Sequence, residues 1–341
     1  MNSKLLYLNI ILIVLSVMCL NVSANPDAPA LYERRILDVP TLHGHPGYAA
    51  AANISGVIDK VLLVVSGFDT ENDDRPEDEL DDLSDDLQGR MDSLLAEGWD
   101  VMYFEYVDGG IDLKHNAGNL AHFIRLIDSV AEPDYHFAVV GGSMGGIVVR
   151  TMFVQEYSDM GVDTYVSVDA PHHGVNLSNW VDNSVASAVA FYMLQHPAGL
   201  QMFNGHRAHN RHYGWLRETE DDGYFLQNVI EPMATCAIAL SDGEASWQLN
   251  VSQFFTHNKW YPVASYLESD GFKTTYMPYH SAVYMHDSST LLSFTFGGYR
   301  YQYKNTESHY FDVKIPNPRF EHDAPDFALN QAIDFVLTSY R

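Results

Sequence analysis

The chain has 341 residues, of which 46% are hydrophobic and 19% charged, a composition typical of a globular protein with one large domain or two small ones. Asp and Glu together number 45 against 19 Lys and Arg, which gives a net charge of −26. A surface this acidic repels phosphate backbones, so the charge argues against nucleic acid as a partner.

The amino terminus has the pattern of a secretory signal peptide. A mostly apolar run from Leu5 to Leu20 is followed by small residues up to Ala24, where signal peptidase would cut. A transmembrane anchor is the alternative because the run approaches spanning length, but the Asn25-Pro26 pair would break the helix. We therefore expect a signal peptide over residues 1–24, a single domain over residues 25–341, and a secreted or periplasmic protein.

From residue 60 onward, buried-strand patterns and amphipathic-helix patterns alternate along the chain. Residues 34–58 are expected to add an antiparallel pair at one edge of the sheet. Continuous apolar runs predict strands at 60–69, 100–107, 135–140 and 163–171. Apolar residues at three- and four-residue steps predict helices at 79–97, 116–130 and 146–157. This alternation calls for a mostly parallel sheet with right-handed crossovers.

The pattern changes after the fourth of these strands. Residues 177–232 are rich in aromatic residues and methionine, helical in places and without a clear strand. We interpret them as an insertion over the carboxyl edge of the sheet, either a lid or acyl pocket or simply a helix packed on the sheet. Strands are predicted again at 234–243 and 289–303, and an amphipathic helix at 324–340 closes the chain.

A serine lies where the strand at 135–140 passes into the next helix. The residues Gly141-Gly142-Ser143-Met144-Gly145 match G-x-S-x-G in the strand–turn–helix context that this motif requires. Small neighbours permit a strained turn that exposes the Ser143 hydroxyl, and a helix amino terminus favours the negative charge that develops in acyl transfer. A glycine-rich turn with an incidental serine is the alternative, but the flanking order favours a nucleophile.

Two segments together resemble a known superfamily. "GGSMGGIVVR" (141–150) is similar to the lipase form of the serine turn, and "DAPHHG" (169–174) resembles the Pro-His-x-Gly segment of bacterial secreted lipases and esterases of the α/β-hydrolase superfamily. The resemblance covers residues 61–174. It implies an α/β-hydrolase fold, with a mostly parallel central sheet flanked by helices, and hydrolysis of carboxylic esters through an acyl-serine intermediate.

The resemblance also implies an oxyanion hole. Many of these lipases have His-Gly after the strand that supplies it, whereas this chain has Ser66-Gly67-Phe68-Asp69. Because the donor is a backbone N–H, the residue identity can vary, and we assign the hole to the amides of Phe68 and Met144. No cofactor is predicted. The expected partner is a small-molecule or lipid ester, transient contact with a lipid surface is compatible with the apolar insertion, and no obligate protein partner is evident.

The serine needs a histidine that is oriented by a carboxylate. The resemblance implies that the histidine precedes the final helix, which favours His322 over His309 and His280. For the acid we narrowly favour Asp242, which lies at the end of the segment 234–243, after the apolar residues of its strand. Asp169 is the alternative acid, although its carboxylate could equally hold the loop that follows it.

Two other classes of function are kept open. His206, His209 and His212 recur at three-residue steps and would suit a metal-dependent hydrolase, although no acidic partner stands nearby and no metal site is predicted. A non-catalytic binding protein on a hydrolase fold is the other alternative. His172 and His173 are expected to support the loop beside the serine.

Overall fold

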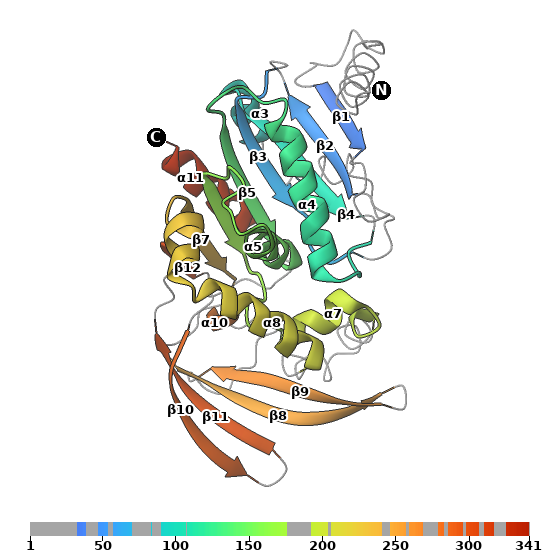
Figure 1. Cartoon of the computed structure of the whole chain (residues 1–341), viewed down its shortest axis with the longest axis vertical. Helices are drawn as coiled ribbons and strands as arrows, with labels where there is room; N and C mark the ends of the chain where they lie inside the picture. Colours follow the sequence, from blue (N-terminus) through green and yellow to red (C-terminus); the bar gives the residue numbers. More distant parts are fainter. Residues whose placement is uncertain are drawn as a thin grey trace.

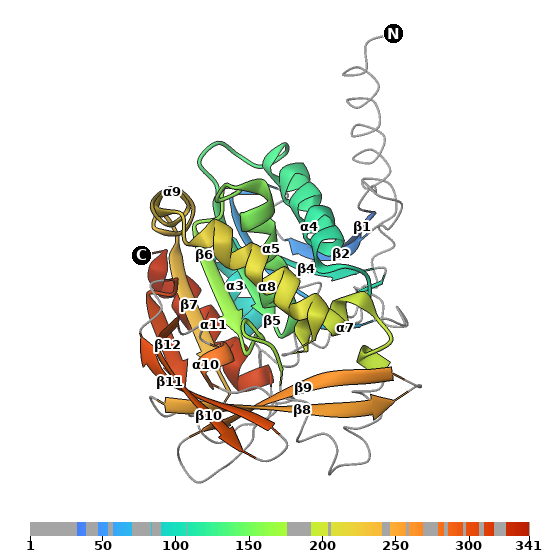
Figure 2. The ribbon, with the colours of Figure 1, turned by 60° about the horizontal axis from the view of Figure 1, so that its bottom comes forward.

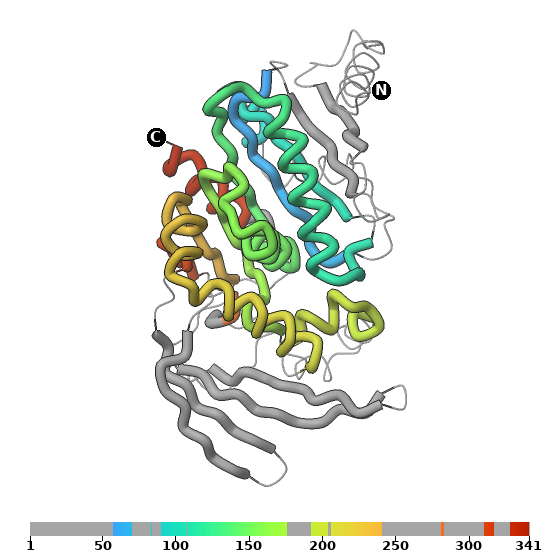
Figure 3. The backbone as a smooth tube through the Cα atoms, viewed as in Figure 1, coloured from blue at the N-terminus to red at the C-terminus, as the bar shows by residue number. Residues whose placement is uncertain are grey.

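The computed structural model describes the backbone of residues 33–38, 47–53, 57–69, 83, 90–106, 108–175, 192–203, 206–240, 246–256, 259–268, 279–282, 286–295, 298–306, 310–316 and 325–340. Side chains are described for residues 57–69, 83, 90–106, 108–175, 192–203, 206–240, 281–282, 310–316 and 328–340, which Figure 3 shows in colour.

Eight strands form one mostly parallel sheet (Figure 1). Its order is β1-β2-β4-β3-β5-β6-β7-β12. The pair β1 (Glu33–Asp38) and β2 (Gly47–Asn53) is antiparallel and lies at one edge, as predicted. The remaining strands run parallel: β4 (Asp100–Tyr106), β3 (Lys60–Val65), β5 (His136–Gly142), β6 (Thr164–Val168), β7 (Ala234–Ala239) and β12 (Val313–Pro316).

Helices cover both faces of this sheet. Side chains of α4 (Leu113–Asp128) and α5 (Met144–Glu156) pack on one face, and those of α3 (Arg90–Ala96) and α11 (Pro325–Ser339) pack on the other. Strand β3 accordingly buries Val61, Leu63 and Val65 on the first face and its intervening residues on the second. A strand buried on both faces must be apolar throughout, which explains the continuous apolar run. The predicted central sheet flanked by helices is confirmed.

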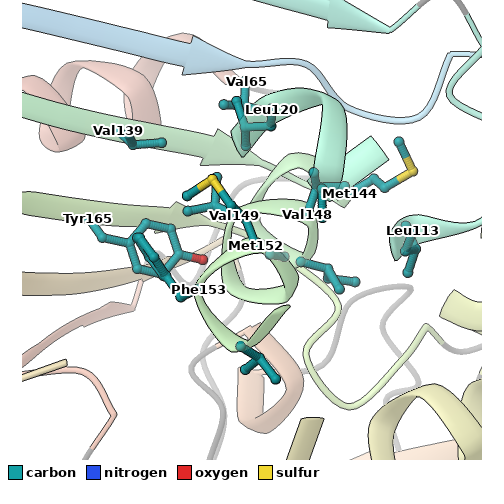
Figure 4. Packing of buried hydrophobic residues seen from close by; sticks show 14 of the residues in the cluster. Val65, Leu113, Leu120, Val139, Met144, Val148, Val149, Met152, Phe153 and Tyr165 are labelled. Carbon is teal, nitrogen blue, oxygen red and sulfur yellow. The ribbon is translucent and has the colours of Figure 1, made fainter. Parts of the chain in front are cut away.

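Helix α5 is the most deeply placed of these helices. All its residues from Met144 to Val154 are buried, so it is apolar around its whole circumference apart from Arg150 and Thr151. Figure 4 shows its side chains beside Val65 of β3, Val139 of β5 and Tyr165 of β6, which belong to one face of the sheet, and beside Leu120 of α4. The rings of Phe153 and Tyr165 meet edge to face at 5.6 Å. This packing fixes the helix that follows the serine.

After the loop at 169–175, the described part of the segment between β6 and β7 is mostly helical. It contains α7 (Pro197–Met202), α8 (Arg207–Glu220), α9 (Gly223–Phe225) and a π-helix (Leu226–Ile230). Figures 1 and 2 both place α8 beside α5. Of the predicted insertion 177–232, the structure describes residues 192–203 and 206–232. The apolar stretch at 179–195, which is predicted to be either a lid or acyl pocket or a helix packed on the sheet, lies mostly outside the described residues. No helix among those that the structure describes is both long and apolar enough to cross a bilayer.

A second sheet lies between β7 and β12 in the chain, and the sequence predicts only one strand for it, at 289–303. It has the order β10-β11-β8-β9 and is antiparallel throughout. Its strands are β8 (Ser246–Thr256), β9 (Lys259–Glu268), β10 (His286–Thr295) and β11 (Gly298–Thr306). The single strand predicted at 289–303 is in fact a hairpin of β10 and β11, because the chain reverses between Thr295 and Gly298.

The buried thiol of Cys236 allows the position of β7 inside the main sheet to be tested. Its side chain is fully buried, and burial raises the pKa of its thiol to about 12. The thiolate is the reactive form, so in a Cys19→Ser background the native protein should not react with a thiol reagent at pH 8. We expect complete modification within minutes only after addition of guanidinium chloride, measured by absorbance of the released chromophore. Equal rates in native and denaturing buffer would contradict the buried position.

Candidate active site

Ser143 occupies a strained turn between β5 and α5. Strand β5 ends at Gly142, α5 begins at Met144, and Ser143 has φ 48° and ψ −120°. A positive φ in a residue with a Cβ costs about 1–3 kcal/mol and persists where surrounding packing imposes it. The side chain is partly exposed. The turn therefore has the geometry expected of one that presents a reactive hydroxyl above the sheet.

Two glycines after the serine allow α5 to approach the sheet closely. A Cβ on Gly145 would lie 2.4 Å from the carbonyl oxygen of Val65 and 2.6 Å from that of Ser66. A Cβ on Gly146 would lie 2.5 Å from the Cβ of Ala170. Backbone atoms cannot move aside cheaply, so only glycine fits at position 145. Gly145 and Gly146 are thus explained by the approach of the helix to the ends of β3 and β6.

The loop after β3 reaches the serine. A Cβ on Gly67 would lie 3.8 Å from the Cβ of Ser143, so the loop passes directly beside the hydroxyl-bearing residue. Phe68 follows in this loop and is partly exposed. Met144 is the first residue of α5, where backbone N–H groups lack partners within the helix. The two segments that carry the predicted oxyanion donors are therefore neighbours.

Asp169 lies at the end of the strand next to the serine. Gly142 pairs with Val168 in register, and the amide of Ser143 donates to the carbonyl oxygen of Val168 at 2.8 Å. Asp169 is 2% exposed, has φ 45°, and accepts a hydrogen bond from the amide of Leu240 at 3.0 Å through Oδ1. The carboxyl group thus joins the ends of β6 and β7. Such a position suits either a triad acid or a structural carboxylate.

The other predicted partners of the serine lie elsewhere in the chain. Asp242, His322 and His309 lie outside the described residues. His280 belongs to α10 (Tyr279–Ala282), and its side chain also lies outside the described part. The site that can be described consists of the Ser143 turn, the loop carrying Phe68, and Asp169. The choices of histidine and acid stay predictions.

The two histidines after Asp169 hold their loop in place. His172 is buried, and its Nε2 lies 2.8 Å from Oγ of Ser167. Burial, with a further contribution from Arg150, lowers the pKa of His172 well below its ordinary value, so the ring is neutral. The amide of His173 donates to Oγ of Ser281 at 2.9 Å, and that hydroxyl donates to the carbonyl oxygen of Gly174 at 2.9 Å. These contacts agree with the supporting role that the sequence suggested.

The histidines of α8 make contacts of other kinds. Nδ1 of His206 accepts from the amide of Ala208 at 3.1 Å and so caps the helix. Nδ1 of His209 lies 2.8 Å from the carbonyl oxygen of Gln201. Among the residues that the structure describes, no three His, Cys, Asp or Glu side chains are grouped to hold a metal ion.

A further pair near the site was not predicted. Arg150 is fully buried and forms an ion pair with Glu220 of α8. The sequence signal was one arginine in an otherwise apolar helix, because such a charge needs a buried partner. That signal does not say which carboxylate provides it, so Glu220 could not be chosen from the sequence.

A mostly parallel sheet in the order given above, with a serine turn between β5 and the helix that follows it, decides the fold. The chain has the α/β-hydrolase fold. No protein-family model matches the chain, and no curated protein matches it in sequence.

Several solved structures are similar to parts of the chain. The lipase BlEst2 of Bacillus licheniformis is 15% identical with a TM-score of 0.36, over 62% of this chain and 73% of that one. The esterase Pf2001 of Pyrococcus furiosus is 15% identical with a TM-score of 0.32, over 50% and 63%. A predicted CIB-like hydrolase of Thermoplasma acidophilum is 19% identical with a TM-score of 0.27, over 41% and 63%.

The close approach of α5 predicts that alanine will affect stability differently at two glycines of the serine turn. Gly145→Ala should lower the free energy of unfolding by about 2 kcal/mol, because the clash with backbone oxygens outweighs the ~1 kcal/mol that alanine gains in a helix. Gly142→Ala is the matched control, since nothing lies within 4 Å of a Cβ there. Urea denaturation followed by circular dichroism measures both. A Gly145→Ala protein as stable as the parent would contradict the packing of the turn.

Two buried histidines predict a loss of stability in acid. Burial lowers the pKa of His209 to about 4 and that of His212 to about 3. The unfolded chain takes up these protons near its ordinary pKa of about 6.5, whereas the native state does not. The stability that depends on these two histidines staying neutral is therefore complete above pH 6.5. Below that pH the free energy of unfolding falls, by up to about 1.4 kcal/mol per pH unit for each histidine.

The measurement compares variants because Asp100 acts in the opposite direction. Burial, followed by the charge of Asp59, raises the pKa of Asp100 to about 7, so its protonation stabilises the native state as the pH falls. We expect His212→Gln to be destabilised at pH 8 and to lose stability less steeply than the parent between pH 6.5 and 4.5. Parallel slopes for parent and variant would contradict the lowered pKa.

Proposed function

We propose that the protein is a serine hydrolase of carboxylic esters that acts through an acyl-serine intermediate. The observation that carries the proposal is the strained turn of Ser143, which is partly exposed at the first turn of a helix. A buried or incidental serine does not require a positive φ at this position, whereas an exposed nucleophile on a strand-to-helix turn does. The neighbouring loop of Gly67 supplies the second side of the site.

The proposed reaction uses the residues in named roles. Ser143 Oγ attacks the ester carbonyl carbon while His322 takes its proton, and the amides of Phe68 and Met144 stabilise the oxyanion. The C–O bond to the alcohol then breaks, and His322 returns the proton to the leaving alcohol. Water, activated by the same histidine, attacks the acyl-serine and releases the carboxylic acid and the free serine.

The carboxylate that orients the histidine has two candidates. Asp242 follows β7, and Asp169 follows β6 beside the serine strand. The burial of Asp169 and its bond to the amide of Leu240 support a fixed carboxylate at the site. They suit a structural role equally well, so the choice needs an experiment.

The substrate, location and partners are proposed from the sequence. We propose a small-molecule or lipid ester as substrate, a secreted or periplasmic location with residues 1–24 as the signal peptide that is cleaved after Ala24, and no nucleic acid partner, given the net charge of −26. A metal-dependent hydrolase has less support, because the histidines of α8 make capping and packing contacts. A chelator such as EDTA therefore serves as a control in the test of activity.

A fluorophosphonate probe, which labels activated serines, tests the proposal. We expect Ser143→Ala to abolish labelling and ester hydrolysis, because the nucleophile is lost, while EDTA leaves both unchanged. His322→Ala should reduce the labelling rate by roughly 10³-fold or more, and the true acid, replaced by Asn, by about 10²- to 10⁴-fold. Labelling is measured by gel fluorescence over time, and hydrolysis with a p-nitrophenyl ester.

Matched variants assign the two uncertain roles. His309→Ala is the control for His322→Ala, and Asp169→Asn is compared with Asp242→Asn under the same conditions. A larger loss with His309→Ala would replace the histidine, and a larger loss with Asp169→Asn would replace the acid. Labelling that persists in Ser143→Ala would end the proposal.

A further inference from the structure

Helix α5 carries one charged residue in its buried stretch, Arg150, two turns after Ser143. Arg150 is 0% exposed, and Glu220 at the end of α8 is 3% exposed. The arginine Nε donates to Oε1 of Glu220 at 2.5 Å, and its Nη2 donates to Oε2 at 2.5 Å. The bidentate geometry joins the helix that bears the serine to a helix of the segment between β6 and β7.

The same guanidinium also reaches the loop after β6. Its Nη1 lies 3.4 Å from the carbonyl oxygen of His172 and 3.5 Å from the Nδ1 of that ring. Arginine can only donate, so Nδ1 of His172 is the acceptor nitrogen and Nε2 carries the proton. That N–H then donates to Oγ of Ser167, 2.8 Å away.

The network closes back on α5. Tyr165 lies in β6, four residues before Asp169, and its hydroxyl donates to the carbonyl oxygen of Gly146 at 2.7 Å. The guanidinium carbon of Arg150 also lies 5.6 Å from the centre of the Tyr310 ring. Strand β6, its loop and α8 are thus all tied to the helix of Ser143 through buried polar groups.

Stability alone is a poor explanation for this pair. Removing two charges from water costs several kcal/mol, and replacing a buried ion pair by apolar residues of similar volume is often neutral or even stabilising. A buried pair that contacts a loop beside a candidate nucleophile has a second use, because it fixes geometry. A displacement of about 1 Å at a reacting group can reduce a rate by about 10²-fold.

We propose that Arg150 and Glu220 are positioning residues for the reaction of Ser143. The pair fixes the segment from Asp169 to Gly174 relative to the serine helix through His172, and it docks α8 on the same helix. The inference rests on the proposed function for its effect on rate. Its effect on the loop is independent of that function, so the two can fail separately.

The test removes both charges together. In Arg150→Met/Glu220→Leu we expect a folded protein whose melting temperature lies within about 5 °C of the parent. The kcat for a p-nitrophenyl ester should fall roughly 10- to 100-fold with KM within about threefold, because the reacting groups are displaced while the ester is still bound. Hydrogen exchange, measured by mass spectrometry, should become at least about tenfold faster in the peptide that covers residues 169–175.

A second ion pair on the same helix is the matched control. Arg125 of α4 pairs with Glu156 at the far end of α5, with side chains 50% and 21% exposed. Arg125→Met/Glu156→Leu should leave kcat within about twofold and exchange of residues 169–175 unchanged, because an exposed pair holds little geometry.

Each result decides the question. Parental kcat or parental exchange in Arg150→Met/Glu220→Leu overturns the positioning role. Phosphonate labelling of Ser143→Ala overturns the proposed function, and with it the effect of the pair on the rate, but not the effect on the loop. Hydrogen exchange of residues 169–175 still tests, in that case, whether the pair holds the loop.

If Arg150→Met/Glu220→Leu does not fold, Glu220→Asp replaces it. We then expect a roughly three- to tenfold fall in kcat with faster loop exchange, and parental values for either would overturn the inference.

Discussion

The described site depends on one constraint, the close approach of α5 to the carboxyl ends of β3 and β6. Gly145 allows the helix backbone to meet the carbonyl oxygens of Val65 and Ser66 at a distance where no Cβ fits. In the turn that leads into this helix, Ser143 has a positive φ and its side chain is partly exposed. The strain at the serine is thus maintained by the packing of an almost wholly apolar helix beneath it.

The burial of α5 also accounts for the ion pair between Arg150 and Glu220. A guanidinium in the middle of α5 must be satisfied within the protein, and Glu220 satisfies it from a helix of another segment. The contact with His172 extends this pairing to the loop that begins at Asp169. Packing and electrostatics therefore act on one small region, in which the serine turn, the adjacent loop and α8 cannot shift independently.

The elements near the serine could be predicted closely from the sequence. Strand β3 is buried on both faces and hence apolar throughout. In α4, apolar residues recur at the three- and four-residue spacing of a helix. The second sheet could not be predicted in the same way. Strands β10 and β11 run together in the sequence as one apolar and aromatic stretch, and only the reversal between Thr295 and Gly298 separates them. Periodicity alone does not reveal such a reversal, and the signal for it is the Gly297-Gly298 pair, a hairpin dipeptide that a reading of 289–303 as one continuous strand passes over.

The sequence by itself determined the order of strands and helices from β1 to β6, the glycine-rich turn and the serine at its centre, because these follow from local spacing and backbone freedom. Only the tertiary structure decided that Asp169 meets the amide of Leu240 and that Arg150 meets Glu220, 70 residues away. Such pairings join segments far apart in the chain. They arise from which faces pack together, and no local pattern in the sequence records that choice.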